Sequence, residues 1–204
     1  LVIPGKPSID FSGPCLLCQE HMDEMRWQFV EDDLSLSRES LCRLGMGFSP
    51  NSGAYTFPMR DHEGQVVGVR LRYPNGKKMS ARGSKNALFY ESCPDYGLVL
   101  ITEGPTDTAA VLGLGFPAIG RPSCNGGRTY LHSMLCWKHD VVIVSDNDKA
   151  GREGSAGLAK VLKSKTKNIR IFTPPKGKDI KDWITVHGAN RSMVEYSIKQ
   201  AKQA

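Results

Sequence analysis

The stretch Leu98–Asp107, LVLITEGPTD, decides how this chain folds, because an apolar strand ends there directly on acidic residues. Its first five residues are apolar or β-branched, which is typical of a buried strand, and Glu103 and Asp107 follow at once. The Gly-Pro pair between these two acids predicts a tight turn into a helix, since Pro is tolerated in a first helical turn. Because parallel strands gather their chemistry at their carboxyl ends, both acids are expected at one edge of a sheet.

Two further acidic clusters follow later strands in the same way. Asp146 and Asp148 come after the apolar run Val141–Val144, and Asp179 and Asp182 come after the next predicted strand. Asp146 and Asp148 are two residues apart, so in an extended segment they point the same way and can share one ion. Oxygen ligands of this kind suit Mg²⁺, which prefers a few carboxylates together with water and substrate phosphates. The sequence therefore predicts a Mg²⁺ site, in which Mn²⁺ substitutes.

The C-terminal half alternates between strand and helix patterns. Strands are expected at 98–102, 117–120, 140–145 and 168–172, and helices at 105–114, 129–136, 150–164, 181–187 and 191–200. This alternation predicts an α/β fold with a parallel sheet, right-handed crossovers and flanking helices.

The N-terminal half has a different pattern. Helices are expected within 19–33 and over 35–44, and residues 54–60 and 65–72 form a hairpin about a turn that contains Asp and Gly. The second hairpin strand places Val67, Val69 and Leu71 on one face. The polar loop 75–85 that follows carries four cations. Taken alone, it is either a solvated hairpin or a surface for a polyanion.

Composition narrows the class of protein. The 204 residues are 40% hydrophobic and 24% charged, which is typical of a globular chain, and the net charge of +6 weakly favours a nucleic-acid partner. No apolar run approaches the roughly 20 residues of a membrane span, so a cytoplasmic protein without a membrane partner is expected. Among six cysteines, Cys15 and Cys18 are followed by His21, but a structural zinc site needs four ligands. These are ordinary thiols or the remnant of a metal knuckle, and zinc is not expected.

Three segments together resemble a known domain: Glu103–Asp107 (EGPTD), Asp146–Gly151 (DNDKAG) and Lys178–Asp182 (KDIKD). In order, spacing and strand context they resemble the Toprim domain that bacterial-type primases share with type IA and type II topoisomerases and some nucleases. The DKAG run, the late KDIKD and the basic segment 57–90 are similar to the catalytic core of DnaG-like primases of bacteria and phages. The loop 122–127, PSCNGG, is closer to phage and plasmid primases.

The resemblance implies roles for individual residues. As catalytic residues it implies Glu103, Asp146 and Asp148. As metal ligands it implies Glu103, Asp146, Asp148, Asp107, Asp179 and Asp182. For nucleic-acid or nucleotide binding it implies Arg70, Arg72, Lys77, Lys78, Arg82, Lys85 and Lys149. It also implies an N-terminal segment at 1–34, either a linker or a remnant after a zinc module, a small α+β basic subdomain at 35–94 and a Toprim catalytic domain at 95–204.

The implied function is that of a DNA primase core that makes short RNA primers on single-stranded DNA, in a phage, plasmid or other mobile element. Its partners would be the template, nucleoside triphosphates and a replicative helicase, fused or separate, at the replication fork. Two alternatives stay open: a Toprim nuclease or RNA-maturation enzyme that uses the same acids to cut, and a non-catalytic DNA-binding Toprim module. The basic subdomain argues against the first, and the complete acidic set argues against the second.

Overall fold

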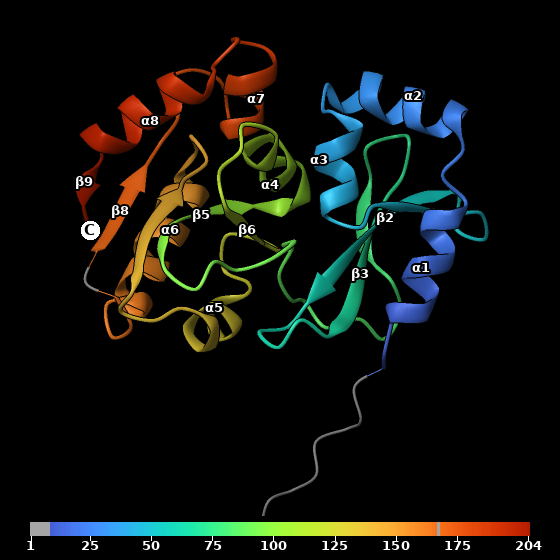
Figure 1. Cartoon of the computed structure of the whole chain (residues 1–204), viewed down its shortest axis with the longest axis horizontal. Coiled ribbons are helices and arrows are strands. Elements are labelled where there is room, and N and C mark those ends of the chain that lie inside the picture. Colours follow the sequence, from blue (N-terminus) through green and yellow to red (C-terminus); the bar gives the residue numbers. More distant parts are fainter. Residues whose placement is uncertain (1–8, 167) are drawn as a thin grey trace, which may run out of the picture.

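The computed structural model describes residues 9–166 and 168–204, in which two β-sheets lie side by side with their own helices (Figure 1). The N-terminal lobe contains α1 (Ser12–Glu20), α2 (Glu24–Leu34), α3 (Arg38–Arg43), β1 (Gly47–Ser49), β2 (Ala54–Arg60), β3 (Val66–Arg72) and β4 (Lys78–Ser80). The C-terminal lobe contains β5 (Gly97–Glu103), α4 (Gly104–Gly113), β6 (Ala118–Arg121), α5 (Arg128–Met134), β7 (His139–Val144), α6 (Lys149–Leu162), β8 (Asn168–Phe172), α7 (Ile180–Thr185), α8 (Arg191–Gln200) and β9 (Lys202–Gln203).

The N-terminal sheet is antiparallel, in the order β1-β2-β3-β4, and contains the predicted hairpin as β2 and β3. The prediction that Val67, Val69 and Leu71 share one face was wrong. Val66, rather than Val67, packs in one cluster with Val69 and Leu71, while Val67 packs in the main core. The cause is a register shift at Met59/Arg60, because one extra residue in a strand moves the side chains before it to the opposite face.

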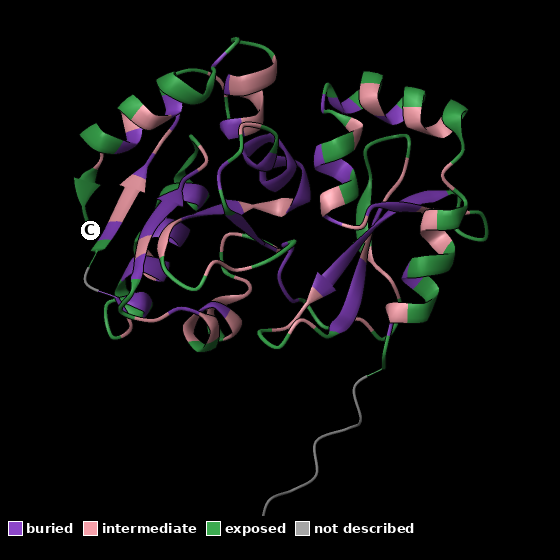
Figure 2. Ribbon diagram, viewed as in Figure 1, coloured by how far each residue is buried: buried purple, intermediate pink, exposed green. Residues whose placement is uncertain are grey.

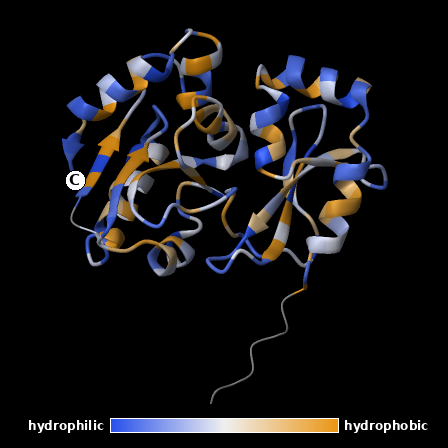
Figure 3. Cartoon of the chain, viewed as in Figure 1, coloured by the Kyte–Doolittle hydropathy of each residue, from blue (hydrophilic) through white to orange (hydrophobic). Residues whose placement is uncertain are grey.

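The C-terminal sheet has the order β6-β5-β7-β8-β9, and its first four strands are parallel as predicted. The short β9 pairs antiparallel with β8 and was not expected, because two residues carry no readable pattern. Alternate residues of the parallel strands go into different core clusters. Leu100, Val142 and Val144 pack with α4, α7 and α8, whereas Val99, Ile101 and Ile143 pack with α5 and α6. Helices therefore cover both faces of this sheet. Its inner strands β5 and β7 are mostly buried in Figure 2, whereas the edge strand β9 is exposed there and hydrophilic in Figure 3.

A short extended segment joins the two sheets. Leu88 exchanges both backbone hydrogen bonds with Arg60 of β2, and Phe89 does the same with Gly120 of β6. The main core also continues from one lobe to the other, since α3 packs against α4 and residues of both lobes share one cluster. Residues 86–90 thus fix the N-terminal sheet beside the carboxyl edge of the parallel sheet.

The N-terminus departs most from the sequence expectation. One helix was expected within 19–33, but the structure has α1 and α2 on either side of residues 21–23. Asp23 caps α2 by accepting a hydrogen bond from the Arg26 N–H, which fixes where the second helix begins. Residues 1–8 of the predicted N-terminal segment lie outside the described residues. Within the described part of the chain, no helix is long and apolar enough to span a membrane.

Candidate active site between the two sheets

A pocket of about 260 Å³ lies where the two lobes meet at the carboxyl edge of the parallel sheet. Its lining comes from β3 and β4 on one side and from the ends of β5, β6 and β7, the start of α4 and the loop before α7 on the other. The lining residues are Arg70, Lys78, Glu103, Gly104, Pro105, Thr106, Asp107, Pro122, Ser123, Asp146 and Asp179. The fold thus brings four of the predicted acids and two of the predicted cations to one place.

Glu103 is the last residue of β5 and pairs in register with Arg121 of β6. The chain turns into α4 at Gly104, whose φ of +79° is in the left-handed region that glycine adopts without strain. The Arg121 guanidinium is only 1% exposed, and its Nη2 lies 3.9 Å from Glu103 Oε2. The strand end therefore presents a carboxylate into the pocket beside a buried cation.

Asp107 lies one turn into α4 and is buried. Its Oδ1 accepts a hydrogen bond of 3.1 Å from the backbone N–H of Lys181, the second residue of α7. This bond ties the start of α7 to α4 and carries Asp179, which lies two residues earlier, to the same pocket.

Asp146 lines the pocket directly after β7, while Asp148 caps α6 by accepting a 2.7 Å hydrogen bond from the Gly151 N–H. Gly151 is required here for space. A Cβ at this position would lie 2.8 Å from the backbone oxygen of Asp146, closer than real Cβ contacts allow. The DNDKAG segment is thus a tight strand-to-helix turn in which Asp148 does not line the pocket.

The third cluster is also a helix start. Asp179 caps α7 by accepting a 2.7 Å hydrogen bond from the Asp182 N–H. The Asp182 carboxylate in turn accepts from the Lys178 N–H at 3.1 Å, so it closes the loop before the helix. Asp179 lines the pocket and Asp182 does not.

The predicted cations divide into two groups. Arg70 and Lys78 line the pocket, opposite the acids. The other five lie outside the pocket lining. Arg72 pairs with Asp33 at 3.1 Å, and Lys149 pairs with Glu153 at 3.8 Å. The Lys77 Nζ lies 6.0 Å from the centre of the Tyr73 ring, and Arg82 and Lys85 are exposed.

The carboxyl groups of Glu103, Asp107 and Asp146 resist ionisation. Burial, followed by repulsion from Glu103, Asp179 and Asp148, raises the pKa of Asp146 to about 7. Burial, followed by repulsion from Asp179 and Asp146, raises the pKa of Asp107 well above its ordinary value. Burial also raises the pKa of Glu103, against the opposing effects of Arg121 and of the Cys124 backbone N–H. Each of these three carboxyl groups therefore favours its neutral form unless a cation comes close to it.

These residues fit a magnesium site in their chemistry. A divalent cation stabilises the ionised form of hard oxygen donors that are crowded together in a buried site. Within residues 9–166 and 168–204, no three Asp, Glu, His or Cys side chains are grouped closely enough to make a complete cage. Mg²⁺ needs no such cage, because it usually keeps several waters and takes further oxygens from substrate phosphates.

Sequence reasoning missed Arg121. It was expected just beyond a strand ending at Gly120, and a single arginine before a proline carries no motif. The available signal was its place at the end of a strand adjacent to β5, because parallel neighbours put their last residues together at one edge.

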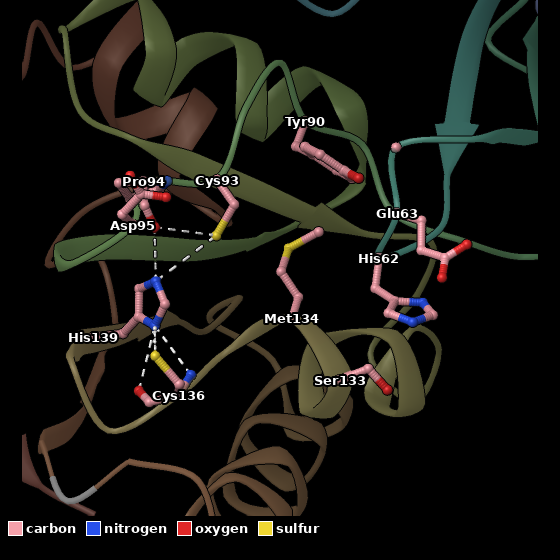
Figure 4. A pocket seen from close by; sticks show the side chains of 11 residues that line it. His62, Glu63, Tyr90, Cys93, Pro94, Asp95, Ser133, Met134, Cys136 and His139 are labelled. Carbon is pink, nitrogen blue, oxygen red and sulfur yellow. Dashed lines mark hydrogen bonds between the residues drawn. The ribbon is translucent and has the colours of Figure 1, made fainter.

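A second hollow of about 450 Å³ lies at the opposite edge of the parallel sheet, around the start of β7 (Figure 4). His139 lies at one side of this hollow, and both of its ring nitrogens contact backbone atoms. Its Nε2 donates to the Pro94 oxygen at 2.8 Å, and its Nδ1 accepts from the Cys136 N–H at 3.0 Å. This histidine joins two loops, and none of the acidic residues above lines the hollow.

Comparison with protein families adds an independent result. The family model described as Toprim-like matches residues 100–184, the segment that contains all three acidic clusters. Residues 100–184 form a Toprim-like domain. This confirms the resemblance seen in the sequence, and with it the expected α/β fold with a parallel sheet flanked by helices. A comparison with curated proteins gives no match.

Solved structures extend the similarity to both lobes. The Escherichia coli primase catalytic core matches with a TM-score of 0.74 and 17% identity, over 95% of this chain and 79% of that one. The DnaG primase catalytic domain bound to single-stranded DNA matches with a TM-score of 0.74 and 17% identity, over 95% and 78%. The primase fragment of the bacteriophage T7 primase-helicase matches with a TM-score of 0.67 and 20% identity, over 80% and 72%. The chain thus has the fold of DnaG-type primase catalytic cores around its Toprim-like domain.

Proposed function

We propose that the chain is the catalytic core of a DNA primase, which joins ribonucleotides into short primers on a single-stranded DNA template. The observation that carries the proposal is the pocket with two unlike walls. Carboxylates from the Toprim-like domain form one wall, and Arg70 and Lys78 of the N-terminal sheet form the other. A cutting enzyme needs the first wall alone, whereas nucleotidyl transfer also needs cations to hold a triphosphate.

Glu103, Asp146 and Asp179 would each offer a carboxylate oxygen to divalent metal, whose other ligands would be water and phosphate oxygens, and Asp107 and Asp148 would lie close by. Bound Mg²⁺ supplies charge neutralisation at the triphosphate and a lower pKa for the attacking 3′-hydroxyl. Arg70 and Lys78 bind the phosphates and align the α-phosphorus with that hydroxyl. A Glu103 carboxylate oxygen accepts the hydroxyl proton as the new P–O bond forms and pyrophosphate leaves.

The remaining cations are proposed to contact the template rather than the reacting phosphates. Lys77, Arg82 and Lys85 are exposed on the N-terminal lobe, so their attraction to a DNA backbone would be independent of sequence and sensitive to salt. The same proposal takes residues 35–94 as the basic subdomain and 95–204 as the catalytic domain. It includes a phage, plasmid or mobile-element origin and a replicative helicase as partner, which the loop 122–127 supports through its likeness to such primases.

Primer synthesis tests the proposal. The assay contains single-stranded template, labelled nucleoside triphosphates and Mg²⁺ or Mn²⁺, and compares wild type with Asp146→Asn and Glu103→Ala. Asp32→Asn is the matched control, because Asp32 undergoes the same chemical change on the exposed face of α2, where its carboxylate accepts hydrogen bonds from Gln28. Short labelled products are expected from wild type and the control and not from the two pocket variants.

The other outcomes decide between the alternatives. Metal-dependent cutting of the template that disappears in both pocket variants would replace the primase with a Toprim nuclease. Template binding without any metal-dependent reaction, even with Mn²⁺ and a range of templates, would leave a binding module.

A further inference from the structure

Arg121 is an unusual residue to find beside an acidic pocket. Its side chain is 1% exposed, and it is the largest fully buried side chain in the described residues. A buried guanidinium is costly unless its donors are satisfied, and removing a partner from such a pair destabilises strongly. The fold retains this cation at the end of β6 although a small or apolar residue would fit a strand end more simply. Its contacts indicate why.

The two ends of the guanidinium reach different parts of the site. Nη1 donates to the backbone oxygen of Cys124 at 2.6 Å, and Nη2 lies 3.9 Å from the carboxylate of Glu103. The backbone N–H of Cys124 also faces Glu103 and favours its ionised form. Arg121 thus links Glu103 to the peptide of Cys124 behind the pocket through its two terminal nitrogens, while its Nε is buried without a hydrogen-bond partner among the described residues.

The loop that contains Cys124 forms part of the pocket itself. Pro122 and Ser123 line the pocket, so any shift of residues 122–127 moves that part of its wall. Arg70 of β3 holds the same loop from the other lobe, since its Nη2 donates to the Pro122 oxygen at 3.2 Å. Arg70 and Arg121, which lie on different sheets, therefore each donate a hydrogen bond to a backbone carbonyl group of the same loop.

We propose that Arg121 is a positioning residue, which fixes Glu103 and the loop 122–127 relative to each other so that the catalytic carboxylate and the pocket wall keep one geometry. This inference rests on the proposed function only for its kinetic consequence. Arg121 itself does not line the pocket, so it acts through Glu103 and Cys124 rather than on the substrate. A carboxylate that is free to turn away would lose alignment, and misplacement of about 1 Å costs a reaction on the order of 100-fold in rate.

The test compares three variants of the whole chain in the primer-synthesis assay. Arg121→Met removes both contacts and keeps an unbranched apolar side chain, and Arg121→Lys keeps the charge with a single head group that cannot serve both partners. Arg128→Met is the matched control, because Arg128 holds the side chain of Asn125 in the same loop at 2.7 Å and shows no contact with Glu103. Thermal unfolding of each variant establishes that it folds.

The expected result is a split between kcat and KM. Arg121→Met should lower kcat by about 30- to 100-fold while KM for the nucleoside triphosphate changes less than about threefold, because the phosphate-binding cations remain. Arg121→Lys should lie between Arg121→Met and wild type, and Arg128→Met should stay within about threefold of wild type in both constants. A folded Arg121→Met variant with the kcat of wild type would overturn the inference. A change in KM alone, or an equal fall of kcat in Arg128→Met, would also overturn it.

Hydrogen exchange separates failure of this inference from failure of the proposed function. If wild type makes no primer, the primase proposal fails, but the positioning role still predicts faster exchange of the amides in 122–127 in folded Arg121→Met. The amides of β5 and β7 should keep their wild-type protection in that variant. Unchanged exchange in the loop would contradict the role whatever the chain catalyses.

Discussion

The ionised carboxylate of Asp146 should lower the free energy of unfolding, and Asp146→Asn tests this in the absence of metal. The pKa of this group rises from an ordinary value of 3.8 to about 7, chiefly through burial and then through the neighbouring acids. A pKa unit corresponds to about 1.4 kcal/mol, so the ionised form costs at most about 4 kcal/mol. Because the side chain is partly exposed to screening solvent, we expect an effective cost of about 1–2 kcal/mol.

The sign follows from proton linkage. Below about pH 4 the carboxyl is protonated in both the native and the unfolded chain. As the pH rises from there to about 7, the unfolded chain releases its proton first, so wild type loses stability relative to the asparagine variant. Above about pH 7 the group is ionised in both states and the difference is constant.

Urea unfolding followed by tryptophan fluorescence measures this difference, in low salt with a chelator present. Asp146→Asn should be more stable than wild type by about 1–2 kcal/mol at pH 8 and by roughly 0.4–0.8 kcal/mol at pH 5, because the unfolded chain is already largely ionised at pH 5. A variant that is equal to wild type or weaker at pH 8 would refute the reasoning, since it would mean that local contacts compensate the buried charge. Asp32→Asn serves again as the exposed control and should change the unfolding free energy by less than about 0.5 kcal/mol at both pH values.

Three shorter predictions concern packing, charge and metal. Gly151→Ala should lower the unfolding free energy by about 1–3 kcal/mol, because its Cβ would meet Asp146 at 2.8 Å, whereas Gly13→Ala, which meets nothing within 4 Å, should be neutral or slightly stabilising. Lys78→Met should raise KM for nucleoside triphosphate in steady-state primer synthesis by about tenfold or more, while the neighbouring Lys77→Met, outside the pocket lining, should change it less than about threefold. Saturating Mg²⁺ should raise the thermal midpoint of wild type at pH 8 and a chelator should reverse the rise; no shift at any concentration would contradict a metal site.

Much of the C-terminal lobe follows from the sequence because its signals are local. Apolar runs such as Val141–Val144 are long enough to predict buried strands, and acids close behind two of them, Glu103 and Asp146, predict the sheet edge. The Toprim resemblance then follows from the order of three short motifs, and the family comparison confirms it. Four of the six predicted metal ligands lie together in one pocket, although their roles remain proposals.

The rest depends on contacts that sequence spacing does not encode. The hairpin pattern placed Val67 with Val69, but a register shift depends on how two strands pair and moved it to the other face. Arg70 and Arg72 look equivalent in the sequence, yet only Arg70 lines the pocket, because the second is held by an acid on α2. Arg121 is buried beside Glu103, which lies 18 positions earlier on the neighbouring strand. No sequence motif indicates that these two residues are paired.

Binding of Mn²⁺ together with a nucleoside triphosphate tests the central claim most directly, namely that the two lobes form opposite walls of one site. Electron paramagnetic resonance measures the free Mn²⁺ with and without a non-hydrolysable triphosphate, in wild type, Asp146→Asn and Lys78→Met. We expect Mn²⁺ to bind wild type more tightly when the triphosphate is present, Asp146→Asn to lose the metal, and Lys78→Met to keep the metal but lose the enhancement by triphosphate. Mn²⁺ binding that is indifferent to the triphosphate, or to both substitutions, would contradict a site shared between the two lobes.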